Sequence, residues 1–295
     1  MSQIGEFNLT EVGVEASQGL RAMVVDALKG RPVAMYVNED PIPWQTFADG
    51  SWDLIGAPEA DGGAGASLRD LICIAQTWGE YVLPSPLMAT IMAKRFSSAA
   101  RQHAGPVSFG MKTRAAGDAF VIPFGNDTNV RIVSNIANGS LPLVEVTTTP
   151  DDFAPSLRLA EGAAATQWNS DAATEMALVW AAEATGCAIR MLDMAVAYAK
   201  ERQQFGEPIG KFQSIKHYLA NAHMLTELSE TATIMGSQDI AKARAAAMYA
   251  LDSSINVIET AIQVHGGLGF TWEMGIHIYL RHAITLREFV NELPA

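Results

Sequence analysis

Apolar residues recur at helical spacing through the first hundred positions of the chain. After Ser67 they fall three or four residues apart, which predicts an amphipathic helix. These positions are Leu68, Leu71, Ile72, Ala75, Trp78 and Val82. Ser67 and Asp70 have the spacing of a capping box at its start, and Pro84 follows its end. The sequence therefore predicts a helical N-terminal domain, residues 1–104, broken by turns.

The pattern changes between residues 105 and 168. Short β-prone runs at 119–123, 130–134 and 143–147 are separated by Gly, Pro, Asn and Asp. Runs this short and this few predict a small, reduced β domain in the middle of the chain.

The remaining residues, 169–295, return to helical spacing from Asp171 onward. Breaks at 206–210, at Gly236 and at 266–269 divide this region into four long helices, which predict an up-down four-helix bundle. Gly186 lies inside the first of these helices, where it could allow close helix packing. The predicted fold is mainly α, with an N-terminal helical domain, a small middle β domain and a C-terminal bundle.

Composition narrows the class of protein. A hydrophobic content of 49% with 18% charged residues indicates a globular chain rather than a disordered one. The formal net charge of -12 argues against binding to nucleic acid or to an anionic membrane surface. No secretory signal and no membrane-spanning stretch is visible. Cys73 and Cys187 stand in apolar helical patterns without metal-ligand spacing, so we expect buried, reduced thiols in a cytoplasmic protein.

Two segments carry candidate binding chemistry. In the first, Glu201–Gln213, Arg202 offers a planar fork of donors suited to a diphosphate, and Phe205 offers a face for a flat ring. Gly206 lets the chain turn, and Gln213 could hydrogen-bond a ribose or a ring edge.

The second segment, Gln263–Phe270, contains Gly266 and Gly267, whose lack of a Cβ lets a ligand approach the backbone closely. Gln263 precedes them on the same segment. Each segment also has a structural interpretation. Arg202 could be a cation that ends a helix, and the two glycines could form a helix C-cap.

Together, in this order, the two segments resemble those with which the acyl-CoA dehydrogenase family holds the FAD of a neighbouring subunit. The resemblance implies cofactor contacts from Arg202, Phe205, Gln213, Gln263, Gly266 and Gly267, and it implies no metal. It is specific over residues 198–285, moderate over 50–100 and weak in the β zone. The turn 57–65, with its proline, acids and glycines, also resembles the family's N-terminal domain.

The chain departs from the family where the flavin ring and the catalytic base are expected. Phe109–Thr113 stands in the place of a threonine-glutamate-proline stretch but lacks its Glu-Pro pair. The tail Leu286–Ala295 contains Glu288 and Glu292 without the Gly-Thr that follows the family's catalytic glutamate. Some relatives place the base near the start of the first bundle helix, where Glu175 lies, although an acid there also suits the helix dipole.

The resemblance therefore implies a short subunit of a heteromeric acyl-CoA dehydrogenase that depends on a longer homologous subunit, as an α2β2 heterotetramer. Such an oxidoreductase dehydrogenates a CoA thioester at the α,β position and passes electrons to an electron-transfer flavoprotein. Stretches such as His277–Ala283 resemble a branch found in bacterial steroid degradation. Two alternatives stay open: a homo-oligomer that uses Glu175 as base, and a non-catalytic structural or regulatory subunit.

The other candidate residues are weaker. His217 and His223 lie six apart without an acidic ligand at zinc spacing. His265 is expected to be structural or to form a wall of the cofactor cleft. Ser253 and Ser254 lack the strand-turn-helix context of a nucleophile elbow, and no Ser-His-Asp arrangement can be argued from the sequence.

Overall fold

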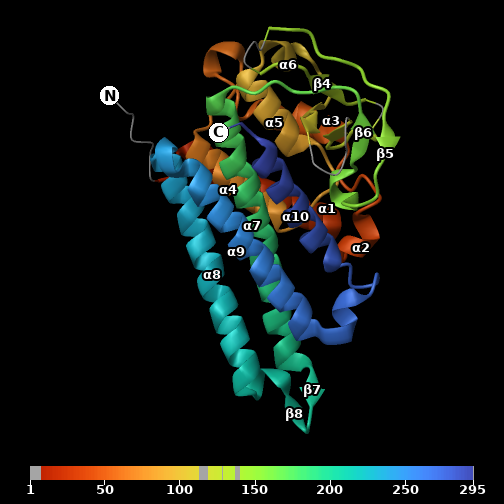
Figure 1. The fold of residues 1–295 in the computed structure, drawn as a ribbon, viewed down its shortest axis with the longest axis vertical. Coiled ribbons are helices and arrows are strands. Elements are labelled where there is room, and N and C mark those ends of the chain that lie inside the picture. The colour runs from red at the N-terminus through yellow and green to blue at the C-terminus, as the bar shows by residue number, and fades with distance from the viewer. Residues whose placement is uncertain (1–7, 113–118, 128, 137–139, 295) are drawn as a thin grey trace.

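The computed structural model describes residues 8–112, 119–127, 129–136 and 140–294. Helices precede a small β region, and a second set of longer helices follows it, so the predicted mainly helical fold is confirmed (Figure 1). No helix in the described ranges is long and apolar enough to cross a membrane. The N-terminal helices and 3₁₀ turns are α1 (Glu11–Leu28), α2 (Val33–Tyr36), α3 (Trp44–Asp49), η1 (Trp52–Leu54), η2 (Glu59–Asp61), α4 (Leu68–Gly79), α5 (Leu87–Phe96) and α6 (Ser98–Gln102).

One buried carboxylate organises the start of this N-terminal region. Ser67 caps α4, and the predicted capping box with Asp70 is present. The Asp70 carboxylate also accepts hydrogen bonds from the backbone N–H and the hydroxyl of Thr10, both at 2.9 Å. Thr10 is the N-cap of α1. A single side chain therefore binds both helix starts and fixes α1 against α4.

The β region consists of two small sheets. β1 (Val107–Phe109) pairs in parallel with β4 (Arg131–Val133). The other sheet has the order β2-β3-β6-β5 and is antiparallel throughout. Its strands are β2 (Met111–Lys112), β3 (Phe120–Ile122), β5 (Thr149–Pro150) and β6 (Ala160–Gly162). The 3₁₀ turn η3 (Pro155–Leu157) connects β5 to β6.

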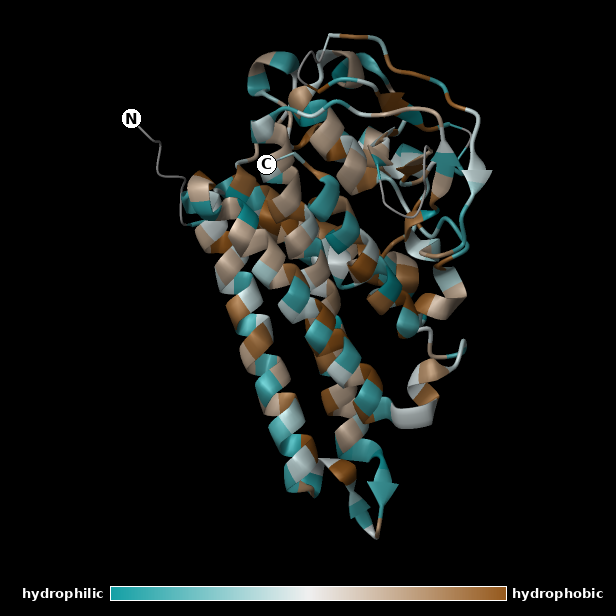
Figure 2. Ribbon diagram, viewed as in Figure 1, coloured by the Kyte–Doolittle hydropathy of each residue, from teal (hydrophilic) through white to brown (hydrophobic). Residues whose placement is uncertain are grey.

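The C-terminal helices run up and down along the long axis of the molecule (Figure 1). They are α7 (Ser170–Glu201), α8 (Gln213–Gln238), α9 (Ile240–His265) and α10 (His277–Glu292). A hairpin, β7 (Gln203–Gln204) and β8 (Glu207–Pro208), followed by the 3₁₀ turn η4 (Ile209–Lys211), connects α7 to α8. The 3₁₀ turn η5 (Gly266–Phe270) follows α9. Figure 2 shows the hairpin as a hydrophilic tip at the end of the molecule opposite the β region.

Backbone contact joins the N-terminal helices to the C-terminal ones. A Cβ placed on Gly79 of α4 would lie 1.8 Å from the carbonyl oxygen of Glu183 on α7. A Cβ placed on Gly186 would lie 1.9 Å from the carbonyl oxygen of Gln76. Only glycine at both positions lets α4 and α7 cross this closely, which confirms the packing role expected for Gly186.

Three details differ from the sequence prediction. α4 ends at Gly79, and Val82, expected on its apolar face, is buried outside the helix with a φ of 41°. α8 continues through Gly236 and ends only before Asp239. The run 143–147 forms a single bridge, Val144 to Ile132, instead of a strand. Local residue preference therefore does not decide the backbone at these three places.

The two cysteines have different environments. Cys187 is fully buried, and its burial raises the pKa of its thiol well above the ordinary value. Cys73, expected to be buried, is only half-buried, and partial burial raises the pKa of its thiol. Both raised pKa values favour the unreactive thiol form at neutral pH.

We expect Gly186→Ala to lower the free energy of unfolding by about 1–3 kcal/mol or more, because the new methyl group forces α4 and α7 apart. Chemical denaturation measures this change. Gly267→Ala is the matched control, since no heavy atom lies within 4 Å of its added Cβ. An equal loss in both variants would contradict the account of the crossing.

Candidate functional site

The first candidate segment forms the hairpin at the end of α7. Phe205 and Gly206 make its two-residue turn, with φ angles of 54° and 82°. Positive φ at both turn residues matches the right-handed twist of the strands. The side chain of Phe205 is 93% exposed at the tip. The hairpin therefore presents an aromatic face outward, away from the chain that carries it.

Arg202 stands at the base of this hairpin as the C-cap of α7. Its backbone carbonyl accepts a hydrogen bond from Ile209 N–H at 2.8 Å, which closes the hairpin. Its side chain is exposed and makes no hydrogen bond or ion pair with any residue that the structure describes. The guanidinium is therefore free to bind an external anion. Gln213 is exposed as the first residue of α8, one 3₁₀ turn further on.

The second segment surrounds the end of α9. Gly266 has φ 60° and ψ -140°, a backbone conformation essentially restricted to glycine. A Cβ built on Gly266 or on Gly267 meets no heavy atom within 4 Å. The chain itself therefore leaves open the space beside both backbone positions. Gln263 is exposed on the last turn of α9, next to this open space.

An aromatic stack brings the two segments to the same end of the molecule. The Tyr198 ring near the end of α7 stacks on the His265 ring at the end of α9, with centroids 4.7 Å apart and planes 25° apart. His265 is buried, and its Nδ1 lies 2.7 Å from the carbonyl oxygen of Ala261. The imidazole therefore fixes the ends of α7 and α9 side by side and is held by structural contacts.

The stretch that stands in the place of the family's flavin-ring segment is tightly packed against this chain's own side chains. Phe109 is fully buried and its ring lies 4.8 Å from that of Trp168. A Cβ on Gly110 would lie 1.7 Å from the carbonyl oxygen of Ala164. The aromatic packing continues from Trp168 to Trp180 and on to Phe289. Thr113, the last residue of the expected stretch, lies outside the described residues.

The two regions that resemble parts of an FAD site therefore differ in this chain. The donor set and the open backbone around Arg202 and Gly267 fit the phosphate half of a dinucleotide. The packed stretch around Phe109 and Gly110 has no such open backbone, since Phe109 is buried and a Cβ on Gly110 would meet the carbonyl oxygen of Ala164. The two regions also lie at opposite ends of α7, whose 32 residues span about 48 Å.

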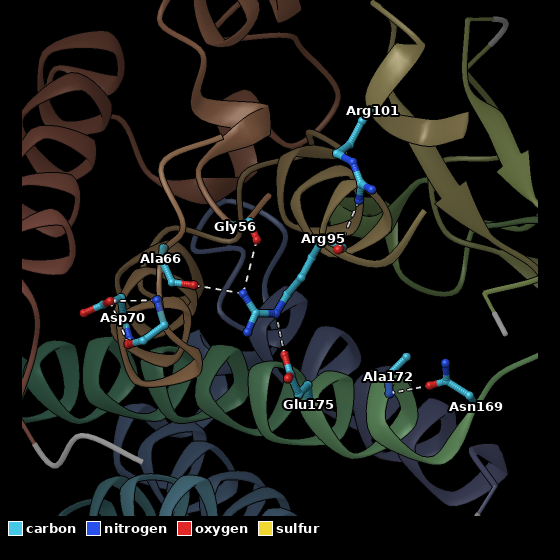
Figure 3. Close-up of polar contacts among 9 residues, drawn as sticks. Gly56, Ala66, Asp70, Arg95, Arg101, Asn169, Ala172 and Glu175 are labelled. Atoms are coloured by element: carbon cyan, nitrogen blue, oxygen red, sulfur yellow. Dashed lines mark hydrogen bonds and ion pairs between the residues drawn. The ribbon is translucent and has the colours of Figure 1, made fainter. Parts of the chain in front are cut away.

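Glu175 is engaged in a structural contact (Figure 3). Its Oε2 accepts a hydrogen bond from Arg95 Nε at 2.6 Å, and both side chains are about one-fifth exposed. Nη1 of the same arginine donates to the carbonyl oxygens of Gly56 and Ala66, at 3.1 and 2.9 Å. The carboxylate thus clamps the ends of the loop before α4 onto the first turns of α7. Glu175 also lies about 40 Å along α7 from Arg202.

The two acids of the tail occupy the end of α10. Glu288 is half-exposed and lines a groove of about 360 Å³ between α10 and the β region. Apolar residues Val121, Phe153, Leu159, Ile284 and Phe289 form most of its wall. Glu292 is half-buried two positions before the end of the described chain. Neither acid approaches Arg202, which lies at the opposite end of the molecule.

A buried polar chain escaped the sequence analysis. Glu183 Oε1 lies 2.9 Å from His282 Nε2, and His282 Nδ1 lies 2.8 Å from Ser156 Oγ. The three residues are at most 3% exposed, so no substrate reaches the serine. The chain connects α7, α10 and η3 and serves packing, not nucleophilic catalysis. His282 stands in the recognised stretch His277–Ala283, but its partners are 99 and 126 residues away in sequence.

Known proteins are similar to this chain in sequence and in fold. The sequence profile described as acyl-CoA dehydrogenase, C-terminal domain, matches residues 168–289. Acyl-CoA dehydrogenase IpdE2 of Mycolicibacterium smegmatis is 30% identical over 257 residues, which cover 83% of this chain and 82% of that protein. No group of three or more His, Cys, Asp or Glu side chains in the described ranges could hold a metal ion.

Solved structures of low sequence identity have the same fold. The ChsE4-ChsE5 complex from Mycobacterium tuberculosis matches with a TM-score of 0.73 at 18% identity, covering 98% of this chain and 95% of that chain. The Tcur3481-Tcur3483 steroid ACAD G363A variant matches with a TM-score of 0.71 at 20% identity, covering 93% of each chain.

Proposed function

Since the chain belongs to the acyl-CoA dehydrogenase family, we propose that it is one subunit of a heteromeric acyl-CoA dehydrogenase. It supplies the phosphate-side contacts of an FAD whose ring lies in a longer homologous subunit. The complex removes hydrogen from the α and β carbons of a CoA thioester and delivers the electrons to an electron-transfer flavoprotein. The assembly is an α2β2 heterotetramer.

The separation of the two half-sites carries this proposal. The free guanidinium of Arg202 and the open backbone at Gly267 face outward at one end of α7. At the other end, Phe109 and Trp168 pack together in the stretch that departs from the family's flavin-ring segment, which supports a ring site in the other subunit. This chain supplies only the outward half of the proposed FAD site, so the site is complete only when a second subunit supplies the other half.

FAD, when bound, supplies the hydride acceptor for the β carbon of the thioester. Arg202 binds and orients the diphosphate through its planar fork. Gly266 and Gly267 let the η5 backbone approach the cofactor, and Phe205 offers an apolar wall from the hairpin tip. Gln213 and Gln263 add uncharged hydrogen bonds. None of these groups moves a proton, and we assign the catalytic base to the longer subunit.

We further propose a steroid-derived acyl-CoA as the substrate class. The support is the similarity to the Tcur3481-Tcur3483 steroid ACAD and, for pairing, to the ChsE4-ChsE5 complex. The homo-oligomer with Glu175 as base is less well supported, because that carboxylate is engaged with Arg95. A purely structural subunit would not need the unpartnered guanidinium of Arg202.

Co-expression tests the assembly. With a longer acyl-CoA dehydrogenase encoded beside it, the chain is expected to give a yellow complex with about one FAD per pair of unlike subunits. Expressed alone, it is expected to be colourless or poorly soluble, because half of the cofactor site is absent. Flavin absorbance measured against protein mass checks this ratio. A homo-oligomer of this chain alone that holds stoichiometric flavin would contradict the proposal.

Glu175→Gln tests whether the catalytic base is Glu175 of this chain or lies in the longer subunit. In the complex, turnover should change less than about threefold, whereas loss of a general base removes 10²- to 10⁴-fold of rate. The free energy of unfolding should fall by about 1 kcal/mol, because Arg95 loses its charged partner. Glu288→Gln and Glu292→Gln should leave turnover unchanged. A thousandfold fall for Glu175→Gln with flavin retained would place the base in this chain.

Arg202→Ala should weaken FAD binding by about 10- to 150-fold, because a hydrogen bond to a charged group contributes roughly 1.5–3 kcal/mol. Arg202→Lys keeps the charge but loses the planar fork of donors. Its FAD affinity should therefore lie between that of Arg202→Ala and that of the unmodified protein. Gly267→Ala should also weaken FAD binding while leaving stability unchanged, since its methyl group fills only the open space. FAD titration of the apo-complex measures all three affinities. If Arg202→Ala binds FAD as tightly as the unmodified protein, Arg202 serves only as a cation at the end of α7.

A further inference from the structure

A cavity of about 270 Å³ opens where the turn between α1 and α2 meets the second half of α7 and the start of α10. Gly275 holds the loop before α10 against α2, since a Cβ on it would lie 2.9 Å from that of Ala34 (Figure 1). The cavity wall is formed largely by tyrosine rings and thioethers. These belong to Tyr36, Tyr81, Tyr279, Met194 and Met274.

Two buried tyrosines form a neutral floor. Tyr36 and Tyr279 are 2% and 3% exposed. The Tyr36 hydroxyl donates to the carbonyl oxygen of Tyr81 at 2.6 Å, and the Tyr279 hydroxyl donates to that of Glu80 at 3.1 Å. Burial raises the pKa of both hydroxyls, so neither carries a negative charge at neutral pH. The floor therefore offers flat apolar rings and no counter-charge for a cation.

The charged groups that line the cavity are two arginines, Arg31 and Arg190, and no acidic side chain of the described ranges lines it. Arg31 is held by Glu39, with 2.8 Å between Nη1 and Oε2. Arg190 is exposed and makes no hydrogen bond or ion pair with a residue that the structure describes. Its guanidinium lies within electrostatic range of both floor tyrosines. In a chain of formal net charge -12, this cavity is therefore locally positive.

The combination of groups defines a class of ligand. A free guanidinium offers parallel N–H donors that match the two oxygens of a carboxylate or phosphate group. Tyrosine rings and thioethers favour contact with a flat apolar body. A mostly apolar wall with a few polar groups is the usual form of a small-molecule site. A neutral ligand would leave Arg190 unpaired, and an inorganic anion would leave the tyrosine floor uncovered.

We propose that this cavity binds a small organic anion. Its carboxylate or phosphate group binds Arg190, and its flat apolar body lies between the tyrosine floor and the thioethers of Met194 and Met274. The site is separate from the proposed FAD contacts, because Arg190 precedes Arg202 by twelve residues, about 18 Å of helix. The proposal therefore does not depend on the proposed function.

Methyl NMR tests where the ligand binds. The full chain, in the form in which it purifies, is labelled at its methionine methyl groups and titrated with benzoate or phenyl phosphate. We expect the signals of Met194 and Met274 to shift, while those of Met224 and Met235, which are exposed on α8, stay in place. Met194→Leu and Met274→Leu assign the two cavity signals. If neither cavity signal shifts with either probe, the proposal is wrong.

Arg190→Gln tests the charge. It should weaken the binding of benzoate and phenyl phosphate by about tenfold or more, because a hydrogen bond between charged groups is lost. Benzamide, which has the shape of benzoate without its charge, should bind the unmodified protein at least about tenfold more weakly than benzoate does. Lys200→Gln is the matched control, since Lys200 is also an exposed cation on α7, and it should leave both affinities unchanged.

Three further results would overturn the site. Benzoate affinity retained in Arg190→Gln would exclude the arginine as the anchor. Inorganic phosphate that binds as tightly as phenyl phosphate would exclude the apolar contacts. Loss of probe binding when the chain is in its complex would mean that the partner covers the cavity. FAD titration of the Arg190→Gln complex is recorded in parallel and should match the unmodified complex, so that a failure of the FAD proposal is told apart from a failure of this one.

Discussion

At the crossing of α4 and α7 the two helix backbones touch with no side chain between them, because Gly79 lies against the carbonyl of Glu183 and Gly186 against that of Gln76. Contacts of this kind fix the relative position of two helices more tightly than interdigitating side chains do. Glu183 also sends its carboxylate to His282, and His282 reaches Ser156. One segment of α7 therefore positions α4, α10 and η3 together, and both the β region and the tail take their places from it.

For the proposed complex, this arrangement explains why one chain contributes only half of a cofactor site. α7 and α9 run in the same direction and end together, joined by the stack of Tyr198 on His265. Their ends carry Arg202 and Gly266 to the tip farthest from the β region. The rigid α7 between the two regions prevents Arg202 from reaching a ring site near Trp168 of the same chain. The proposed FAD site therefore needs a second subunit to supply its other half.

Features set by nearby residues were predictable from the sequence, and features set by distant contacts were not. The capping box of Ser67 and Asp70 follows from three-residue spacing, and the packing role of Gly186 follows from a glycine inside a helix. The second function of Asp70, its contact with Thr10, joins positions 60 residues apart. The same holds for Arg95 with Glu175, 80 residues apart. At Val82 the local pattern misled the prediction. This β-branched residue takes a positive φ outside the helix, and its burial compensates for the strain. For the candidate site, the sequence named residues that the fold brings to one end, but it could not show that Phe109 packs on Trp168 near the other end.

In the proposed complex, the hairpin at the tip would couple cofactor binding to assembly. Its strands contain two residues each, and isolated hairpins of this size are marginally stable in water. Exposed Phe205 gains apolar contacts only when another molecule covers it. A partner that orders this hairpin removes part of the entropic cost of binding the diphosphate, and a bound diphosphate likewise favours the ordered hairpin. Such coupling is reciprocal. In the proposed complex, the affinity for FAD and the affinity between the subunits are therefore linked quantities.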